Sequence, residues 1–245
     1  MKKLLSFVAL IFSLQVFAAD LTKLEYITET YPPYNFKEEG KLKGIAVELL
    51  EAATKAAGHP VKNSDIKLQP WARGYRQALS GKMTALFSTS RTEERESKFQ
   101  WVGPITDTRI VVWAPKAKGI KIGSAADLKS YKIGAIRDDV GEQLVKAAGV
   151  PEGNIKLSPK PEAVAKKLQS GRVDLWAYEE NVAAFIMKAN GINTADFEVV
   201  HVLKEAKLFY SLSKDVPGDI VSKLQGGVDK VKSSGDFDKI LSKYR

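Results

Sequence analysis

The sequence predicts an α/β protein made of two lobes that face each other across a cleft. Segments 78–87 and 167–176 resemble each other, because each reads as the end of a helix, a Ser-Gly stop, a basic residue and then a strand. They lie about ninety residues apart, which is too far for a solenoid repeat. About 225 residues follow a predicted leader, enough for two small lobes or one large domain. One copy of this helix–strand unit in each lobe explains the similarity.

The first half of the chain alternates predicted strands and helices. Apolar residues at helical spacing, followed by a glycine, mark the first helix. Pro32 and Pro33 forbid helix and hold the loop after the first strand extended. The expected elements are strand 23–28, helix 44–58, strand 66–69, a helix ending at Ser80, and a short buried strand at 83–87.

The second half continues the alternation. The extended run 109–113 is expected to carry the chain into the second lobe, and 207–212 is expected to return it to the first. The other expected elements are a surface loop at 116–121, strands 131–136, 155–157, 173–176 and 198–203, a helix opening at 137–142, and helices 161–169, 181–189, 220–233 and 236–244.

Ser88, Ser90 and Arg95 form the first candidate binding site. The hydroxyl residues follow a predicted strand, and Thr92 is placed to cap a short helix that carries acids in its first turn. Ligands of open α/β sheets bind beyond the carboxyl ends of the strands. Hydroxyls beside a guanidinium suit a small carboxylate, because the guanidinium can bond both oxygens. The plainer alternative is a solvated arginine with ordinary turn serines.

The second copy of the unit delivers Tyr178 and Glu179 to the end of its own strand. One lobe then offers an arginine and the other a carboxylate, which is the charge pattern for a zwitterion. Aromatic rings near predicted strand ends can stack on a ligand or receive a cation, although core packing is their commoner use. These aromatic residues are Tyr31, Tyr34, Trp71, Trp176 and Tyr178.

The first 19 residues read as a cleavable secretory signal peptide. Two lysines precede an apolar core at 4–14, and small residues favour cleavage after Ala18 or Ala19. A signal anchor is the alternative, but the apolar core is too short to span a bilayer. The chain has no cysteine, which excludes a disulfide framework and a lipid-modified cysteine. We therefore expect a mature chain that is free in the periplasm.

Composition argues against several classes of partner. The formal net charge of +9 falls to +7 without the two leader lysines, but the basic residues are scattered, so we expect no nucleic-acid partner. His59 and His201 have no carboxylate or cysteine at metal-ligand spacing, so we expect no metal. The absence of a glycine-rich phosphate loop favours a protein without a cofactor.

The order of several short motifs resembles a known family, the periplasmic solute-binding proteins of the polar amino acid ABC transporter type (bacterial extracellular solute-binding protein family 3). The motifs are Tyr31–Tyr34, Gly44–Leu49, Ser80–Lys82, Thr92–Arg95, Ile133–Gly134 and Ser170–Asp174. The resemblance implies a two-lobe periplasmic-binding-protein type II fold with two hinge strands and an interlobe ligand cleft. It places a signal peptide at 1–19, lobe 1 at 20–110 and 206–245, and lobe 2 at 111–205.

The resemblance also implies roles for individual residues. Arg95 would hold the α-carboxylate of the ligand, helped by Ser88 and Ser90. The position that usually supplies an aspartate for the α-ammonium falls on Glu179. The rings of Tyr31 and Tyr34 would line the wall of the first lobe.

The chain departs from the family pattern at two positions that bear on the ligand. The family often has a Gly-Thr-Thr type turn after the first strand of the second lobe, where this chain has Asp138-Asp139-Val140. Asp139 either contacts the ligand or caps the following helix. Glutamate at 179 adds a methylene, shifting the charge by about an ångström. Within the wider class of amino acids and related amines or carboxylates, these departures favour an amine, a modified amino acid or a small peptide rather than a standard amino acid.

Pro70-Trp71-Ala72-Arg73 resembles a branch of the family with a Pro-Trp-x-Arg element. Trp71 and Arg73 either join the pocket or pack the lobe. We expect a monomeric, non-enzymatic binding protein that closes by hinge motion and delivers its ligand to a membrane ABC permease. The alternatives are a periplasmic dehydratase-like enzyme with Glu179 as acid or base, and a sensor module that presents its ligand to a receptor.

Overall fold

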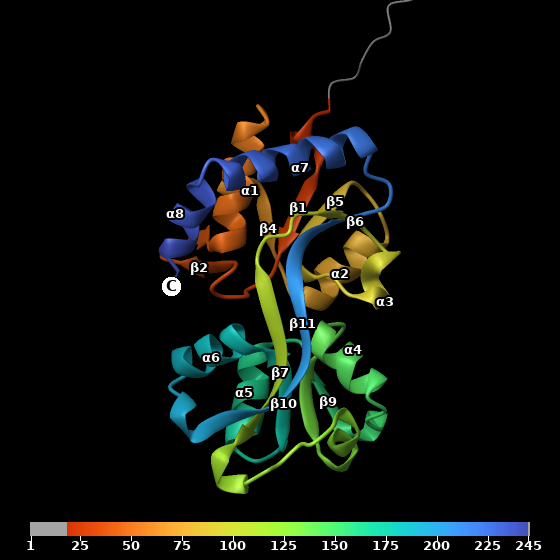
Figure 1. Ribbon diagram of the computed structural model, residues 1–245, viewed down its shortest axis with the longest axis vertical. Helices are drawn as coiled ribbons and strands as arrows, with labels where there is room; N and C mark the ends of the chain where they lie inside the picture. The colour runs from red at the N-terminus through yellow and green to blue at the C-terminus, as the bar shows by residue number, and fades with distance from the viewer. Residues whose placement is uncertain (1–18, 245) are drawn as a thin grey trace, which may run out of the picture.

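The computed structural model describes residues 19–244, and the predicted leader lies outside them apart from Ala19. Two α/β halves lie one above the other and are joined by two long strands, β7 and β11 (Figure 1). Lobe 1 holds β1 to β6, α1 to α3, α7 and α8, and lobe 2 holds β8 to β10 and α4 to α6. Within residues 19–244, no helix is long and apolar enough to cross a membrane.

The strands are β1 Glu25–Thr28, β2 Phe36–Glu38, β3 Lys41–Lys43, β4 Ile66–Leu68, β5 Thr84–Ser90, β6 Gln100–Val102, β7 Asp107–Pro115, β8 Ile133–Ile136, β9 Ile155–Ser158, β10 Leu175–Glu179 and β11 Phe197–Leu212. The helices are α1 Ile45–Ala56, α2 Trp71–Leu79, α3 Glu93–Glu96, α4 Val140–Ala147, α5 Pro161–Gln169, α6 Glu180–Ala189, α7 Gly218–Ser233 and α8 Asp236–Ser242.

One continuous path of strands runs through both lobes, in the order β4-β1-β5-β11-β7-β10-β8-β9. In lobe 1, β1 lies parallel to β4 and β5, and in lobe 2, β8 lies parallel to β9 and β10. β11 is antiparallel to β5 and to β7, so it belongs to both lobes. The carboxyl ends of β1, β5, β8 and β10 carry the candidate residues, as expected for ligand sites of α/β sheets.

The expected strands 198–203 and 207–212 are one 16-residue strand, β11, and this part of the prediction was wrong. The middle of β11 is half-exposed where it passes between the lobes, so the apolar pattern that marks a buried strand is lost there. The expected lobe boundaries at 110 and 205 fall inside β7 and β11. The hairpin formed by β2 and β3 was not predicted. Helix α5 has the bounds that the sequence predicted, residues 161–169.

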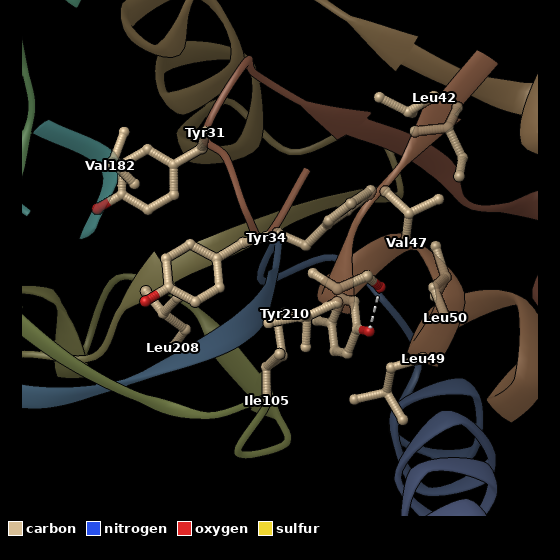
Figure 2. Packing of buried hydrophobic residues seen from close by; sticks show 14 of the residues in the cluster. Tyr31, Tyr34, Leu42, Val47, Leu49, Leu50, Ile105, Val182, Leu208 and Tyr210 are labelled. Atoms are coloured by element: carbon tan, nitrogen blue, oxygen red, sulfur yellow. Dashed lines mark hydrogen bonds between the residues drawn. The ribbon is translucent and has the colours of Figure 1, made fainter. Parts of the chain in front are cut away.

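A buried hydrophobic cluster fills lobe 1 and continues to residues of lobe 2 such as Trp176, Tyr178 and Val182. Figure 2 shows part of it, where the hydroxyl of Tyr210 donates to the carbonyl of Ala46 at 2.7 Å. This packing fixes α1 on the sheet of lobe 1, and α1 in turn holds the loop that carries Tyr31 and Tyr34.

Candidate functional site

The loop between β1 and β2 brings Glu29, Tyr31 and Tyr34 to the edge of lobe 1. Asn35 fixes this loop: its Nδ2 donates to the carbonyl of Glu29 at 2.6 Å, and its Oδ1 accepts from the hydroxyl of Ser88. The backbone amide of Tyr31 donates to the carbonyl of Asn35 at 2.6 Å, which closes the turn. The loop is therefore tied both to itself and to β5.

Gly44 holds the other end of the same loop. Its φ is +124°, and a Cβ there would lie 2.3 Å from the carbonyl oxygen of Tyr34. This close approach lets the amide of Ala46, in the first turn of α1, donate to that carbonyl at 2.9 Å. Only glycine permits both the backbone angle and the contact, so Gly44 sets the position of Tyr34.

The sequence placed Ser88 and Ser90 after a strand at 83–87, but β5 runs to Ser90, so both lie inside the strand, and both are buried. Ser88 has a φ of +64° and sits where the pairing of β5 with β11 shifts register, so it is the extra residue of a β-bulge. Its hydroxyl donates to Asn35, so it positions the loop; its contact with a ligand stays a prediction. The carbonyl of Ser90 accepts from Nη1 of Arg95 at 3.4 Å.

Arg95 is 0% exposed, although the surrounding segment is rich in exposed charges. Its guanidinium carbon lies 5.4 Å from the ring centre of Trp71 and 5.0 Å from that of Tyr75. Its Nη2 donates to the carbonyl of Asp138 in lobe 2 at 3.3 Å, and its Nε has no partner among the described residues. The predicted cap by Thr92 is not made, because its buried hydroxyl has no partner there either.

The turn before α4 is the part of lobe 2 that faces Arg95. Asp139 is the N-cap residue of α4, and its Oδ2 accepts from the amide of Gly141 at 3.4 Å. Of the two alternatives, the capping role is therefore present. Asp138 has a φ of +61°, and its carbonyl accepts from the indole Nε1 of Trp71 at 2.8 Å. Trp71 and Arg95 thus reach one carbonyl across the interface.

Burial and neighbouring charges shift the pKa values of the acidic residues around Arg95. Burial raises the pKa of Asp139, and the charge of Arg95 partly opposes this. Burial also raises the pKa of Glu29 well above its usual range, the charge of Asp139 raises it further, and Arg95 lowers it. The charge of one guanidinium, that of Arg95, therefore acts on both Asp139 and Glu29 and lowers the pKa of each.

Glu179 is 0% exposed and caps α6. Its Oε2 accepts from the amide of Val182 at 2.7 Å, and its Oε1 accepts from the hydroxyls of Tyr34 at 3.0 Å and Thr108 at 3.3 Å. The side-chain Nδ2 of Asn181 donates a longer bond of 3.4 Å to Oε1. Burial raises the pKa of Glu179, and the donors partly oppose this rise. Protein donors thus surround this carboxylate in the present conformation.

Aromatic rings fill the space between the charged groups. The ring centres of Tyr31 and Tyr178 lie 5.8 Å apart in an edge arrangement across the lobes, and Trp176 stacks on Tyr178 at 5.2 Å. The hydroxyl of Tyr178 and the indole nitrogen of Trp176 are buried without a partner among the described residues. These two atoms therefore lack the hydrogen bond that buried polar groups usually make.

The structure brings most of the predicted site residues to the contact between the lobes. These are Tyr31, Tyr34, Trp71, Arg95, Asp139, Tyr178 and Glu179, whereas Ser88 and Ser90 are buried within lobe 1, where they bond Asn35 and Arg95. Arg73 is not among them, because it is exposed on α2; Arg76, one helical turn later, lies 3.6 Å from the carboxylate of Asp138. Sequence reasoning missed Glu29, although its position directly after β1 is a signal of the same kind that marked Ser90.

A family model described as bacterial extracellular solute-binding proteins, family 3, matches residues 26–245. A protein of Neisseria gonorrhoeae named "probable histidine-binding protein" is 27% identical over 221 residues, which cover 88% of this chain and 80% of the relative. A "probable amino-acid-binding protein" of Bacillus subtilis is 26% identical over 218 residues, covering 86% and 79%.

Solved structures share the fold. An ancestral arginine-binding protein bound to arginine is 26% identical, with a TM-score of 0.75, and the match covers 91% of this chain and 98% of that one. A histidine kinase sensor domain with similarity to periplasmic binding proteins matches with a TM-score of 0.79 at 20% identity, covering 91% and 96%. At that identity the second likeness concerns the fold alone.

Proposed function

The chain belongs to the bacterial extracellular solute-binding proteins, family 3, and from this membership we propose that it captures an amino acid or a related zwitterion between its lobes. One observation carries the proposal: Arg95 of lobe 1 and Glu179 of lobe 2 are both buried where the lobes meet. Arg95 binds the α-carboxylate and Glu179 the α-ammonium. Relatives named for binding histidine, arginine or amino acids support this ligand class.

The mechanism requires hinge motion and no chemical step. A ligand that contacts both lobes stabilises the closed arrangement, because it loses half of its contacts when the lobes separate. β7 and β11 are the hinge strands. Tyr34 to Glu179, and Trp71 to Asp138, are bonds between lobes that form only on closure. The closed form then moves through the periplasm to a membrane ABC permease, which recognises it. Family membership supports this partner, and the predicted signal peptide supports the periplasmic location.

The test is a thermal-shift screen of the mature chain against the common amino acids, amines and short peptides, followed by calorimetry on each compound that raises the melting temperature. A ligand that binds only the folded state must raise that temperature, by an amount that grows with the logarithm of its concentration divided by its dissociation constant. We expect at least one amino acid to bind with 1:1 stoichiometry. If amines or short peptides bind and no amino acid does, the amino acid assignment is wrong.

The raised pKa of Glu179 favours one second candidate, an enzyme that uses this carboxyl as an acid or base. Its protein donors argue for a structural role instead, because they already occupy the carboxylate and partly oppose the rise in its pKa. Turnover of cyclohexadienyl acids, present in the native chain and lost in Glu179→Gln, would establish the enzyme. Binding without turnover supports transport.

A further inference from the structure

Two phenylalanine rings, one from each lobe, meet at the rim of the interlobe contact. Phe36 lies on β2 of lobe 1 and Phe185 on α6 of lobe 2, and their ring centres are 5.7 Å apart with the planes at 49°. In Figure 1, β2 and α8 of lobe 1 lie on the same side of the molecule as α6 of lobe 2. Both rings line an open groove of about 810 Å³. This pair, here called the rim contact, joins the lobes outside the predicted site residues.

Phe185 is one of the few large apolar side chains on the surface. It is 43% exposed even in the arrangement that brings it to Phe36. An apolar ring in water carries a free-energy cost, which falls where another ring covers part of it. Because the two rings belong to different lobes, Phe185 loses this cover when the lobes separate. The rim contact therefore favours the closed arrangement.

The ring of Phe36 is held in place from within lobe 1. It is 8% exposed, the ring of Tyr244 meets it edge-on with centres 6.3 Å apart, and Nζ of Lys43 lies 5.4 Å from its centre. The hydroxyl of Tyr244 accepts from the amide of Gly44 at 3.0 Å. Gly44 is the residue that sets the position of Tyr34. The lobe 1 half of the rim contact is therefore fixed to the loop that enters the site.

Helix α6 connects the lobe 2 half of the rim contact to the site. Glu179 caps this helix, and Phe185 lies one turn beyond Asn181 on it. The side-chain Nδ2 of Asn181 donates to the hydroxyl of Tyr34 at 3.3 Å and to Glu179 at 3.4 Å. Rotation of α6 with lobe 2 therefore breaks the rim contact and the bonds to Glu179 together.

We propose that Phe185 is a positioning residue for binding: through Phe36 it holds the lobes closed without contacting the ligand. The inference rests on the hinge closure of the proposed function and not on the identity of the ligand. The aromatic pair stabilises only the closed arrangement, because it is lost when the lobes separate. A compound enclosed by both lobes leaves after they separate. The rim contact therefore slows release by the same factor for every compound that binds.

The first experiment measures association and dissociation rates by stopped-flow fluorescence, for each common amino acid that raises the melting temperature of the mature chain. Phe185→Ala should raise the dissociation rate about twofold to tenfold, the size of one aromatic pair, and by the same factor for each amino acid. The association rate should stay native. Phe185→Tyr keeps the ring and should release at the native rate. Leu79→Ala is the matched control, because Leu79 is 45% exposed at the end of α2 remote from Trp71.

A double-mutant cycle tests whether Phe36 is the partner. Phe36→Leu keeps an apolar side chain in the hairpin but removes the ring, and its melting temperature reports that it folds. If the rim contact is the cause, Phe36→Leu raises the dissociation rate, and adding it to Phe185→Ala causes no further rise. Effects that multiply in the double variant overturn the inference.

A further measurement needs no ligand. Because the chain has no cysteine, one dye can be attached through Ser64→Cys in lobe 1 and one through Lys166→Cys in lobe 2, both at exposed positions. Single-molecule energy transfer should show a smaller closed fraction in Phe185→Ala than in the native chain. An unchanged closed fraction with native release rates overturns the inference alone. Failure of every amino acid to bind overturns the proposed function, and the closed fraction then decides the inference by itself.

Discussion

The hydroxyl of Tyr34 in lobe 1 donates to Oε1 of Glu179 in lobe 2 across 3.0 Å. Both side chains are almost fully buried, and Gly44 and Asn35 hold the loop that carries Tyr34. Burial and the charge of Glu179 raise the pKa of Tyr34, so its hydroxyl stays protonated and able to donate. This bond therefore couples closure of the lobes to the carboxylate that we assign to the ligand's ammonium.

Tyr34→Phe should weaken ligand binding more than it weakens the fold. A hydrogen bond to a charged group contributes about 1.5–3 kcal/mol, so we expect the dissociation constant to rise by about tenfold or more in calorimetry. Tyr26→Phe is the matched control, because that tyrosine is about as buried and its hydroxyl bond to the carbonyl of Leu21 lies within lobe 1. It should lower the melting temperature and leave affinity unchanged. If both variants change affinity equally, the Tyr34 bond has no special part in closure.

Substitution of Arg95 should abolish binding. Arg95→Ala removes the guanidinium that we assign to the carboxylate, and Arg95→Lys keeps the charge but cannot bond two oxygens in one plane. We expect loss of detectable heat for the first and weakened binding for the second, with circular dichroism reporting that both remain folded. The control is Arg91→Ala: Arg91 is exposed and pairs with Glu96. Native affinity in Arg95→Ala would remove the assigned role.

The strand-end rule made much of the site predictable. Glu179 and Ser90 end strands, and Arg95 follows one by a single turn, so the sequence pattern and the rule for α/β sheets located all three. Asp139 was predicted with two alternatives, and the cap is present in the structure. The glycine stops at Gly81 and Gly171 have the positive φ that their position after a helix predicted.

The remaining features depend on contacts between distant segments, which periodicity does not encode. The indole nitrogen of Trp71 donates to the carbonyl of Asp138, which is 67 residues away in the sequence. The direction of that carbonyl depends on the positive φ of Asp138, which is unusual for a residue other than glycine. β11 was divided in two because its middle passes between the lobes and lacks a buried face. Glu29 went unnoticed because a single acid after a strand has no distinguishing pattern until its burial is known.

The buried acids make stability depend on pH in a predictable direction. Asp139 has a raised pKa in the folded protein, so its contribution to stability is complete below its ordinary pKa of 3.8 and is lost as pH rises through the raised value. Asp139→Asn keeps a capping oxygen and removes this loss. We expect the melting temperature of Asp139→Asn, relative to the native chain, to increase between about pH 4 and pH 7.

Asp215 provides the control of opposite sign. The hydroxyl of Ser213 and the amides of Met83 and Lys82 lower its pKa, so its stabilisation is present above the ordinary pKa and lost as pH falls through the lowered value. Asp215→Asn should therefore lose stability relative to the native chain as pH rises through that range. Parallel pH profiles for the two variants would contradict the assigned directions.

Two adjacent glycines of α7 should respond to alanine in opposite ways. A Cβ on Gly227 would lie 2.3 Å from the backbone oxygen of Ala53 in α1, because the two helices pack closely there, whereas a Cβ on Gly226 meets nothing within 4 Å. Gly227→Ala forces α7 away from α1 and should destabilise the chain by about 1–3 kcal/mol in denaturant unfolding. Gly226→Ala lowers the entropy of the unfolded chain at an exposed helix position and should stabilise it by about 0.5–1 kcal/mol. Because α1 also holds the loop of Tyr34, Gly227→Ala should raise the dissociation constant of the ligand as well, whereas Gly226→Ala should leave it unchanged. If the two variants bind the ligand equally well, the position of α1 does not affect the site.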